Sequence, residues 1–226
     1  MKATEKDCPE EVIKHVRNVD LTDDENASLF AWIAGKAPLD CQVHCVTEVA
    51  DRIDATSHPE VIADFCSAAA TYARLLEPES VAKVKAAYLR FNYDKNIHSN
   101  YFLGLRYNRI DLRNEFSGKI EPDWSFTNPR KDAETWHYYL YLASLDEPGA
   151  YEALNKKIAG TISGNDVTNL LKSLADLKTE GARKILLNYK GDKRTSDTAV
   201  GPGPPISETV SGILNSNYKD PPPPAR

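Results

Sequence analysis

The sequence predicts an all-α fold in which antiparallel helix pairs stack as a solenoid, and three observations support this prediction. Segment 142–150 resembles segment 174–182, about 32 residues further along the chain. A fainter copy aligns 73–78 with 143–148. Apolar residues also recur at helical spacing along most of the chain. A unit with an apolar helix, a short Pro/Gly turn and a second helix is typical of helical solenoids.

The N-terminal part is expected to contain five helices. The first runs from Pro9 to about Val19, with proline near its first turn. The second starts at Thr22, where Thr22 and Glu25 have the spacing of a capping box, and ends near Gly35. The third helix is expected to be capped by Asp40. The fourth is expected to run from Glu60 to about Leu76, and the fifth to start at Pro78.

The repeat pattern is interrupted between about residues 92 and 130. This stretch lacks a clean helical period and contains several glycines and prolines. We expect an ordered insertion with a short helix around Tyr101 to Arg113. Together with the helices on either side, it is expected to belong to a single domain, residues 1–219.

Helical periodicity returns at Asp132 and continues in pairs. One helix carries Leu140 and Leu142, and Tyr151 to Ile158 form its partner. The next pair is expected to start with Asn165 or Asp166 as a cap and to end near Tyr189. A loop at 191–205, a last helix starting at Pro204 or Pro205, and an extended or disordered proline-rich tail at 220–226 complete the chain.

Four cysteines lie in the first third of the chain, and their even number favours two disulfides. Cys41 and Cys45 are four residues apart on a predicted helix, where β-carbons lie roughly 5–6 Å apart, whereas a disulfide requires about 3.8 Å. Each is therefore expected to pair outward, one with Cys8 and the other with Cys66, in either order. The alternative is four buried free thiols, as in many cytosolic proteins.

Disulfides favour an oxidising compartment, so we expect a periplasmic or secreted protein. The residues after Met1 are hydrophilic and do not form a secretory signal. Either the protein is cytoplasmic, or this is a mature chain whose signal was replaced by a start codon.

Composition excludes several classes of function. The net charge of −5 provides no basic face for nucleic acid, and no apolar run is long enough to span a membrane. His44 and Cys45 point in different directions on a helix, so they cannot converge on a metal with Cys41. The sequence has no nucleophile elbow or phosphate loop. We therefore predict no catalytic residues, metal or cofactor, and no enzyme activity.

The insertion is the best candidate for a partner-binding site, because interface hot spots are enriched in Trp, Tyr and Arg. In the alternative interpretation its aromatic residues fill the gap at the break in the solenoid. Acidic residues at 20–25 could steer a basic partner, or simply form a solvated helix end. The predicted partner-binding residues are Tyr101, Arg106, Tyr107, Arg109, Arg113 and Trp124, with Tyr138 from the following helix.

The segments 140–158 and 170–189 resemble HEAT-like helical repeats. The matches are Leu142, Leu145, Asp146 and Pro148 in the first segment, and Leu174-Ala175-Asp176-Leu177 with Arg183 in the second. Tyr151 stands where the earlier repeat would have that basic residue. The resemblance implies a right-handed stack of helix pairs with a concave, protein-binding face.

A small, acidic, helical repeat protein with disulfides also resembles bacterial immunity proteins. That resemblance implies a protein partner, a toxin or effector, that is neutralised by occlusion. The alternatives are an adaptor or assembly scaffold of the cell envelope, or a helical enzyme whose site is assembled from dispersed residues such as His98, Arg106, Asp111 and His137.

Overall fold

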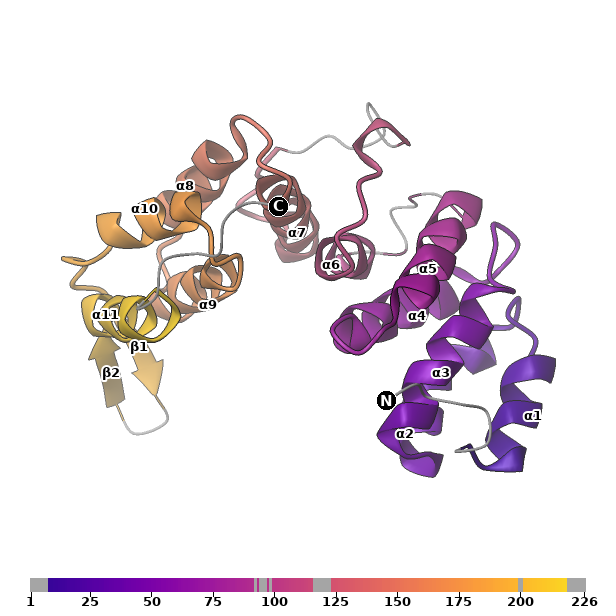
Figure 1. Cartoon of the computed structure of the whole chain (residues 1–226). Helices are drawn as coiled ribbons and strands as arrows, with labels where there is room; N and C mark the ends of the chain where they lie inside the picture. Colours follow the sequence, from indigo (N-terminus) through magenta and orange to yellow (C-terminus); the bar gives the residue numbers. More distant parts are fainter. Residues whose placement is uncertain are drawn as a thin grey trace. The chain divides into compact units, whose positions relative to one another are not determined.

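The computed structural model describes residues 8–91, 93, 97, 99–115, 123–198 and 201–218. The chain forms two compact units, Met1–Pro122 (unit 1) and Asp123–Arg226 (unit 2). The region 1–219, expected as a single domain, is thus divided inside the predicted insertion. The regular secondary structure of the described residues is helical apart from a two-stranded sheet (Figure 1), so the all-α class is confirmed.

Unit 1 consists of helices joined by short turns. The structure begins this unit's second helix at Leu29, later than predicted, because residues 24–26 form a separate 3₁₀ turn capped by Asp23, whose carboxylate accepts from Glu25 N at 3.0 Å. The elements are α1 (Glu10–Asn18), η2 (Asp24–Asn26), α2 (Leu29–Lys36), α3 (Leu39–Ala50), α4 (Pro59–Tyr72), α5 (Pro78–Phe91), α6 (Asn100–Tyr107) and η3 (Arg113–Glu115).

Unit 2 contains two helical hairpins and a final helix. The loop predicted at 191–205 contains a β-hairpin, in which β1 (Thr195–Thr198) pairs with β2 (Gly201–Pro205) in antiparallel orientation. The tail 220–226 lies outside the described residues. The elements are α7 (Pro129–Ser144), α8 (Ala150–Gly160), α9 (Gly164–Ala175), α10 (Glu180–Asn188), β1 (Thr195–Thr198), β2 (Gly201–Pro205) and α11 (Ile206–Asn217).

The turns of the two hairpins in unit 2 have the same local geometry. The backbone N–H of Asp146 donates to Ala143 O at 3.2 Å, and that of Lys178 donates to Ala175 O at 3.1 Å. Asp146 and Lys178 both have left-handed backbone conformations, with φ of 54° and 53°. These residues are related by the offset of the sequence repeat, so the similar segments adopt similar turns.

Two predicted caps are wrong. Pro38, not Asp40, precedes α3, and Asp40 lies in the first turn, where its charge favours the helix dipole. Ser163, not Asn165 or Asp166, caps α9, because its hydroxyl accepts from Asp166 N at 3.3 Å. In both cases the helix starts earlier than the apolar pattern indicates.

One of the two predicted disulfides is present. Cys8 is bonded to Cys41, with a Cα–Cα distance of 5.0 Å, and this bond ties the start of α1 to α3. The second prediction is wrong, because Cys45 and Cys66 are free and buried. Burial raises the pKa of both thiols to about 12, which makes them poor nucleophiles for disulfide exchange.

These thiols lead to a first prediction. Reduction should raise the intact mass by two hydrogens, not four. The native protein should resist a thiol reagent such as Ellman's reagent, and denaturation without a reductant should release two reactive thiols. A mass increase of four hydrogens, or no increase at all, would contradict the pairing.

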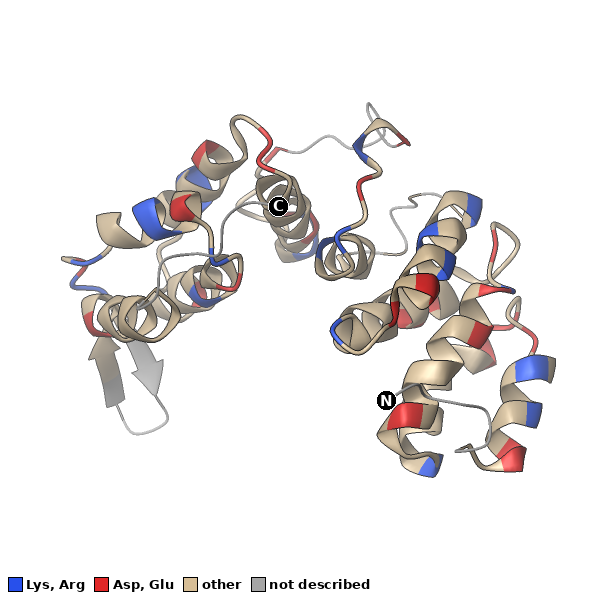
Figure 2. Cartoon of the chain, viewed as in Figure 1, with Lys and Arg blue, Asp and Glu red and all other residues tan. Residues whose placement is uncertain are grey.

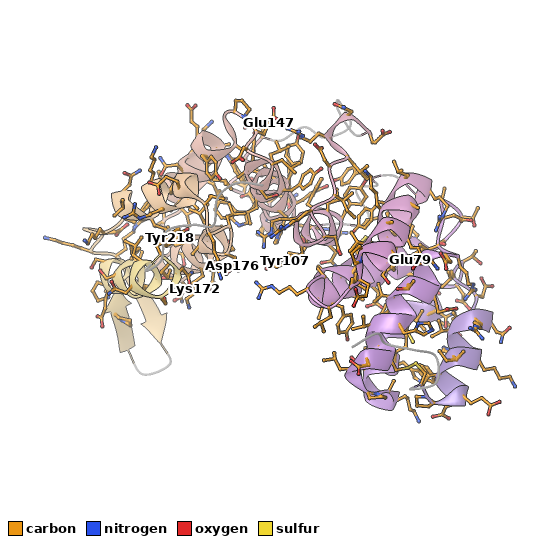
Figure 3. The ribbon with its side chains drawn as sticks, viewed as in Figure 1. Glu79, Tyr107, Glu147, Lys172, Asp176 and Tyr218 are labelled. Atoms are coloured by element: carbon orange, nitrogen blue, oxygen red, sulfur yellow. A yellow bond between two sulfur atoms is a disulfide. The ribbon has the colours of Figure 1, made fainter. Side chains whose placement is uncertain are left out.

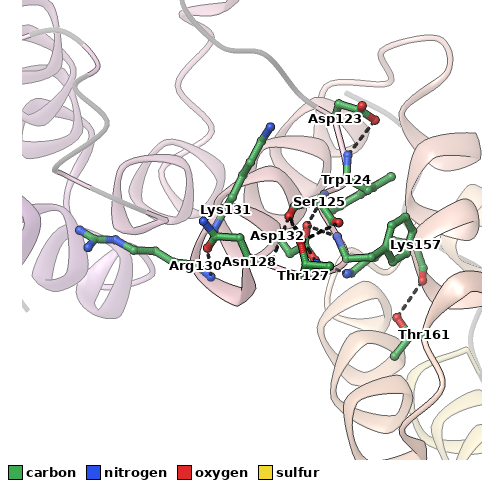
Figure 4. A network of polar contacts seen from close by, with 11 residues as sticks. Asp123, Trp124, Ser125, Thr127, Asn128, Arg130, Lys131, Asp132, Lys157 and Thr161 are labelled. Atoms are coloured by element: carbon green, nitrogen blue, oxygen red, sulfur yellow. Dashed lines mark hydrogen bonds and ion pairs between the residues drawn. The ribbon is translucent and has the colours of Figure 1, made fainter.

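A buried ion pair holds the entry to α7 in unit 2. Asp132 bonds Lys157 of α8 at 2.6 Å, and the two side chains are 10% and 12% exposed. The other carboxylate oxygen of Asp132 accepts from Ser125 N at 2.8 Å and Phe126 N at 3.3 Å. Figure 4 shows this network, in which Asp132 joins the segment before α7 to α8.

Aromatic rings complete the environment of Lys157. Its ammonium nitrogen lies 4.5 Å from the ring centre of Phe126 and 5.5 Å from that of Trp124. Burial alone raises the pKa of Asp132, but the ion pair and the two N–H donors outweigh it and hold the pKa below 3.8. The Asp132 carboxylate therefore stays ionised at neutral pH.

Among the described residues, no helix combines the length and apolar character needed to cross a lipid bilayer.

Candidate partner-binding surface

The structure separates the predicted partner-binding residues into three groups. The buried residues are Tyr101 (1% exposed), Trp124 (8%) and Arg106 (9%). Tyr107 and Arg109 are exposed, and Arg113 and Tyr138 are partly buried. Trp124 and Tyr138 belong to unit 2 and the other five to unit 1.

Tyr101 is part of the aromatic core of unit 1. Its ring centre lies 5.1 Å from that of Tyr88, 5.3 Å from Tyr93 and 5.4 Å from Phe102. Phe65 of α4 also packs against Tyr88. The alternative interpretation, in which aromatic residues of the predicted insertion fill the interior, therefore describes Tyr101 correctly.

Trp124 has a comparable role in unit 2. Its ring lies 6.4 Å from that of Trp136 and 5.5 Å from that of Tyr139, both on α7. Tyr138, on the same helix, packs its ring 5.5 Å from Tyr139, and burial raises the pKa of its hydroxyl. Tyr141, also on α7, is fully buried.

A shallow depression in unit 1 brings one predicted residue together with four that the sequence did not single out. It has a volume of about 380 Å³ and lies between the C-terminal halves of α4 and α6. Figure 3 shows Tyr107 at the end of α6. The lining residues are Ala70, Thr71 and Arg74 from the α4 side and Leu103 and Tyr107 from α6.

Close packing of α4 and α6 creates this depression. Gly104 lets the two backbones approach: a β-carbon there would lie 2.9 Å from Cys66 O and would overlap the Tyr88 hydroxyl. Just beyond α6, the side-chain amide of Asn108 donates to Ala69 O and Gly104 O, both at 2.9 Å. The C-terminal turn of α6 is therefore fixed on α4, with Tyr107 on its outer side.

Two arginines lie at or beside the depression: Arg74 lines it, and Arg106 contacts Tyr107, which also lines it. The guanidinium carbon of Arg106 lies 4.6 Å from the ring centre of Tyr107, within cation–π range. The Nη1 atom of Arg106 is buried and has no hydrogen-bond partner. By contrast, unit 1 as a whole is acidic, with 15 Lys and Arg against 20 Asp and Glu, whereas unit 2 has 13 of each. Figure 2 shows where the charged residues of the described segments lie.

Two of the acidic residues at 20–25, Asp20 and Asp23, have local structural roles. The carboxylate of Asp20 accepts from the backbone N and hydroxyl of Thr22 at 2.9 and 2.7 Å, which lowers the Asp20 pKa. Arg113 has a similarly local partner, because its guanidinium bonds Asp111 at 2.8 Å. The observed geometry gives these charges structural roles that do not involve a ligand.

A second surface groove lies in unit 2 between α8 and α10. This groove is larger and flatter than the depression in unit 1. Two contacts fix the side chain of Tyr151, which lines the groove: its hydroxyl donates to Ala143 O at 3.1 Å and lies 2.7 Å from Thr179 Oγ1. The lining residues are Tyr151, Glu152, Asn155, Gly181, Lys184, Ile185 and Asn188.

The described residues contain no group of three or more His, Cys, Asp or Glu side chains that could hold a metal ion. The dispersed residues of the enzyme alternative are not brought together within one unit. His98 lies outside the described residues, Arg106 and Asp111 belong to unit 1, and His137 belongs to unit 2.

No protein-family model matches this sequence, and neither a curated protein nor a solved structure shows significant similarity to it.

Proposed function

We propose that this chain is a protein-binding module, an immunity protein that neutralises a cognate secreted antibacterial toxin by occluding it. The depression between α4 and α6 carries this proposal. It presents an exposed tyrosine and an exposed arginine over an apolar floor, and Tyr and Arg are the residues enriched in interface hot spots. A rigid helical pair supports it, so little conformational entropy would be lost on binding.

The proposed architecture is a HEAT-like, right-handed solenoid. The two hairpins of unit 2 support it, because α7–α8 and α9–α10 have matching turns at the repeat offset. In unit 1 the turn between α4 and α5 shares one feature: Leu75 N donates to Tyr72 O at 2.8 Å, as Leu145 N donates to Leu142 O at 3.0 Å.

The proposed location is the periplasm or the exterior of the cell. The Cys8–Cys41 disulfide supports it, since such bonds persist mainly in oxidising compartments. An immunity protein in this location would meet its toxin after delivery and before the toxin reaches its target.

An adaptor of the cell envelope is a second candidate function. The groove between α8 and α10 favours an adaptor, because this groove gives unit 2 a candidate binding surface separate from that of unit 1. An adaptor would bind two proteins, one through each unit, whereas an immunity protein would form a complex with a single toxin.

Titration of the purified partner tests the proposal. We expect a complex of defined stoichiometry, complete loss of the partner's activity at equivalence, and at least about 30-fold weaker binding for Tyr107→Ala, the loss typical of a hot spot. Leu89→Ala is the matched control, because Leu89 is also exposed on unit 1 but lies on α5, away from the depression. Partner activity that persists at saturation would rule out neutralisation.

A further inference from the structure

Three arginines at the C-terminal ends of α4 and α6 differ from all the other arginines of unit 1. Four arginines have acceptors: Arg17 and Arg113 pair with carboxylates, and Arg52 and Arg90 donate to backbone carbonyls. Among the described residues, the guanidiniums of Arg74, Arg106 and Arg109 have no such acceptor, although unit 1 has more acidic than basic residues. The unpaired arginines are therefore grouped at one place, the C-terminal ends of α4 and α6.

Helix dipoles explain only part of this grouping. Cations are favourable near a helix C-terminus, and Arg74 and Arg109 each lie one or two residues beyond one. That interaction needs no burial. Arg106 is nine-tenths buried and its Nη1 lacks an acceptor, an arrangement that costs free energy in the unbound protein. Among the residues that the structure describes, no carboxylate therefore compensates the charge of Arg106.

We propose that the depression receives an aspartate or glutamate side chain from the protein partner. Arg74, exposed at the edge, supplies a fork that can bind a carboxylate through two parallel hydrogen bonds. Arg106, whose guanidinium carbon lies 4.6 Å from the ring centre of Tyr107, adds a second positive charge next to the depression. Ala70 and Leu103 provide an apolar wall for the methylene groups of the acidic side chain.

This inference rests on the proposed function and specifies the chemistry of the partner. The recognised element is an acidic side chain next to apolar residues on an exposed loop. Binding should weaken as salt concentration rises, because an exposed arginine contributes part of the attraction.

A displayed library of random linear peptides, selected against the full-length protein with its disulfide intact, tests the proposal. We expect enrichment of peptides with one Asp or Glu beside apolar residues. Synthetic versions should bind at least tenfold more weakly to Arg74→Gln, and also after their own acid is replaced by its amide. Lys36→Gln removes an exposed cation from α2 of the same unit and should leave binding unchanged.

Selected peptides without an acid, acidic peptides that bind Arg74→Gln as well as the parent protein, or no enrichment at all would each overturn the proposal. Arg74 is exposed, so Arg74→Gln should fold, and an unchanged melting temperature verifies this. A toxin that is neutralised equally well by Arg74→Gln would refute the acidic contact and leave the immunity function standing.

Discussion

Replacing Gly104 with alanine is expected to destabilise unit 1 by about 3 kcal/mol, at the upper end of the usual range for overpacking. The new β-carbon would lie 2.9 Å from a backbone atom of α4, Cys66 O, and would overlap the Tyr88 hydroxyl. Tyr88 is fully buried and cannot move aside freely. The helices would have to separate, which would also displace Tyr107. Urea unfolding, with hydrogen exchange to locate the effect in unit 1, measures this loss.

Gly35→Ala is the matched control. Gly35 lies in α2 of the same unit, and a β-carbon there would meet nothing within 4 Å. Alanine is the better helix former by about 1 kcal/mol, so this variant should be as stable as the parent protein or more stable. Equal stability of the two variants would show that α4 and α6 do not pack as closely as described.

Removing one partner of the Asp132–Lys157 pair is expected to destabilise unit 2 by about 3–5 kcal/mol, because each single substitution leaves a buried charge without its counter-ion. Both side chains are almost fully buried, so solvent cannot replace the lost partner. Lys157→Met and Asp132→Asn should both show the loss. The double variant should lose less than the sum of the two, which a double-mutant cycle measures.

The neighbouring Lys156 is exposed and serves as the control: Lys156→Met should change stability by no more than about 0.5 kcal/mol. The effect of Asp132→Asn should also depend on pH. The Asp132 pKa is lower in the folded state, so the stabilisation is complete above the unfolded pKa and disappears as pH falls through the folded value. A difference between Asp132→Asn and the parent that remains constant from pH 7 to pH 2 would contradict this.

The helices could be predicted from the sequence because their apolar spacing is local information. The turn at 145–149 and its copy at 176–179 could be predicted for the same reason, since short segments specify them. Start points were less accurate: Ser163 caps α9, although residues closer to the apolar run were preferred. Several residues near a helix start can accept the same N–H group, and the sequence does not show which one does.

The site was predicted only in part. Aromatic density at 92–130 indicated either an interface or a core, and the structure assigns Tyr101 and Trp124 to the cores of different units. Exposure depends on contacts between distant segments, which spacing does not reveal. On the α4 side of the depression, the sequence contains one indication of close helix packing, the run of small residues at 68–70. Small residues permit close approach by a glycine-containing helix such as α6.

The disulfide shows a similar limit. Helical geometry correctly excluded a bond between Cys41 and Cys45. It left Cys8 and Cys66 as the two possible partners of Cys41, and Cys41 pairs with Cys8. The even number of cysteines then favoured a second disulfide. Cys45 and Cys66 are instead buried thiols, a role in which cysteine acts as a small apolar residue.

Parallel affinity capture tests the central claim, that this chain binds a protein through the surface between α4 and α6. The parent protein and the double variant Arg74→Gln/Tyr107→Ala would be used as baits on native extract under non-reducing conditions, followed by size exclusion. We predict one stoichiometric partner with the parent protein and its loss with the variant, at equal melting temperatures. Capture of the same partner by both baits, or of none by the parent protein, would contradict the account.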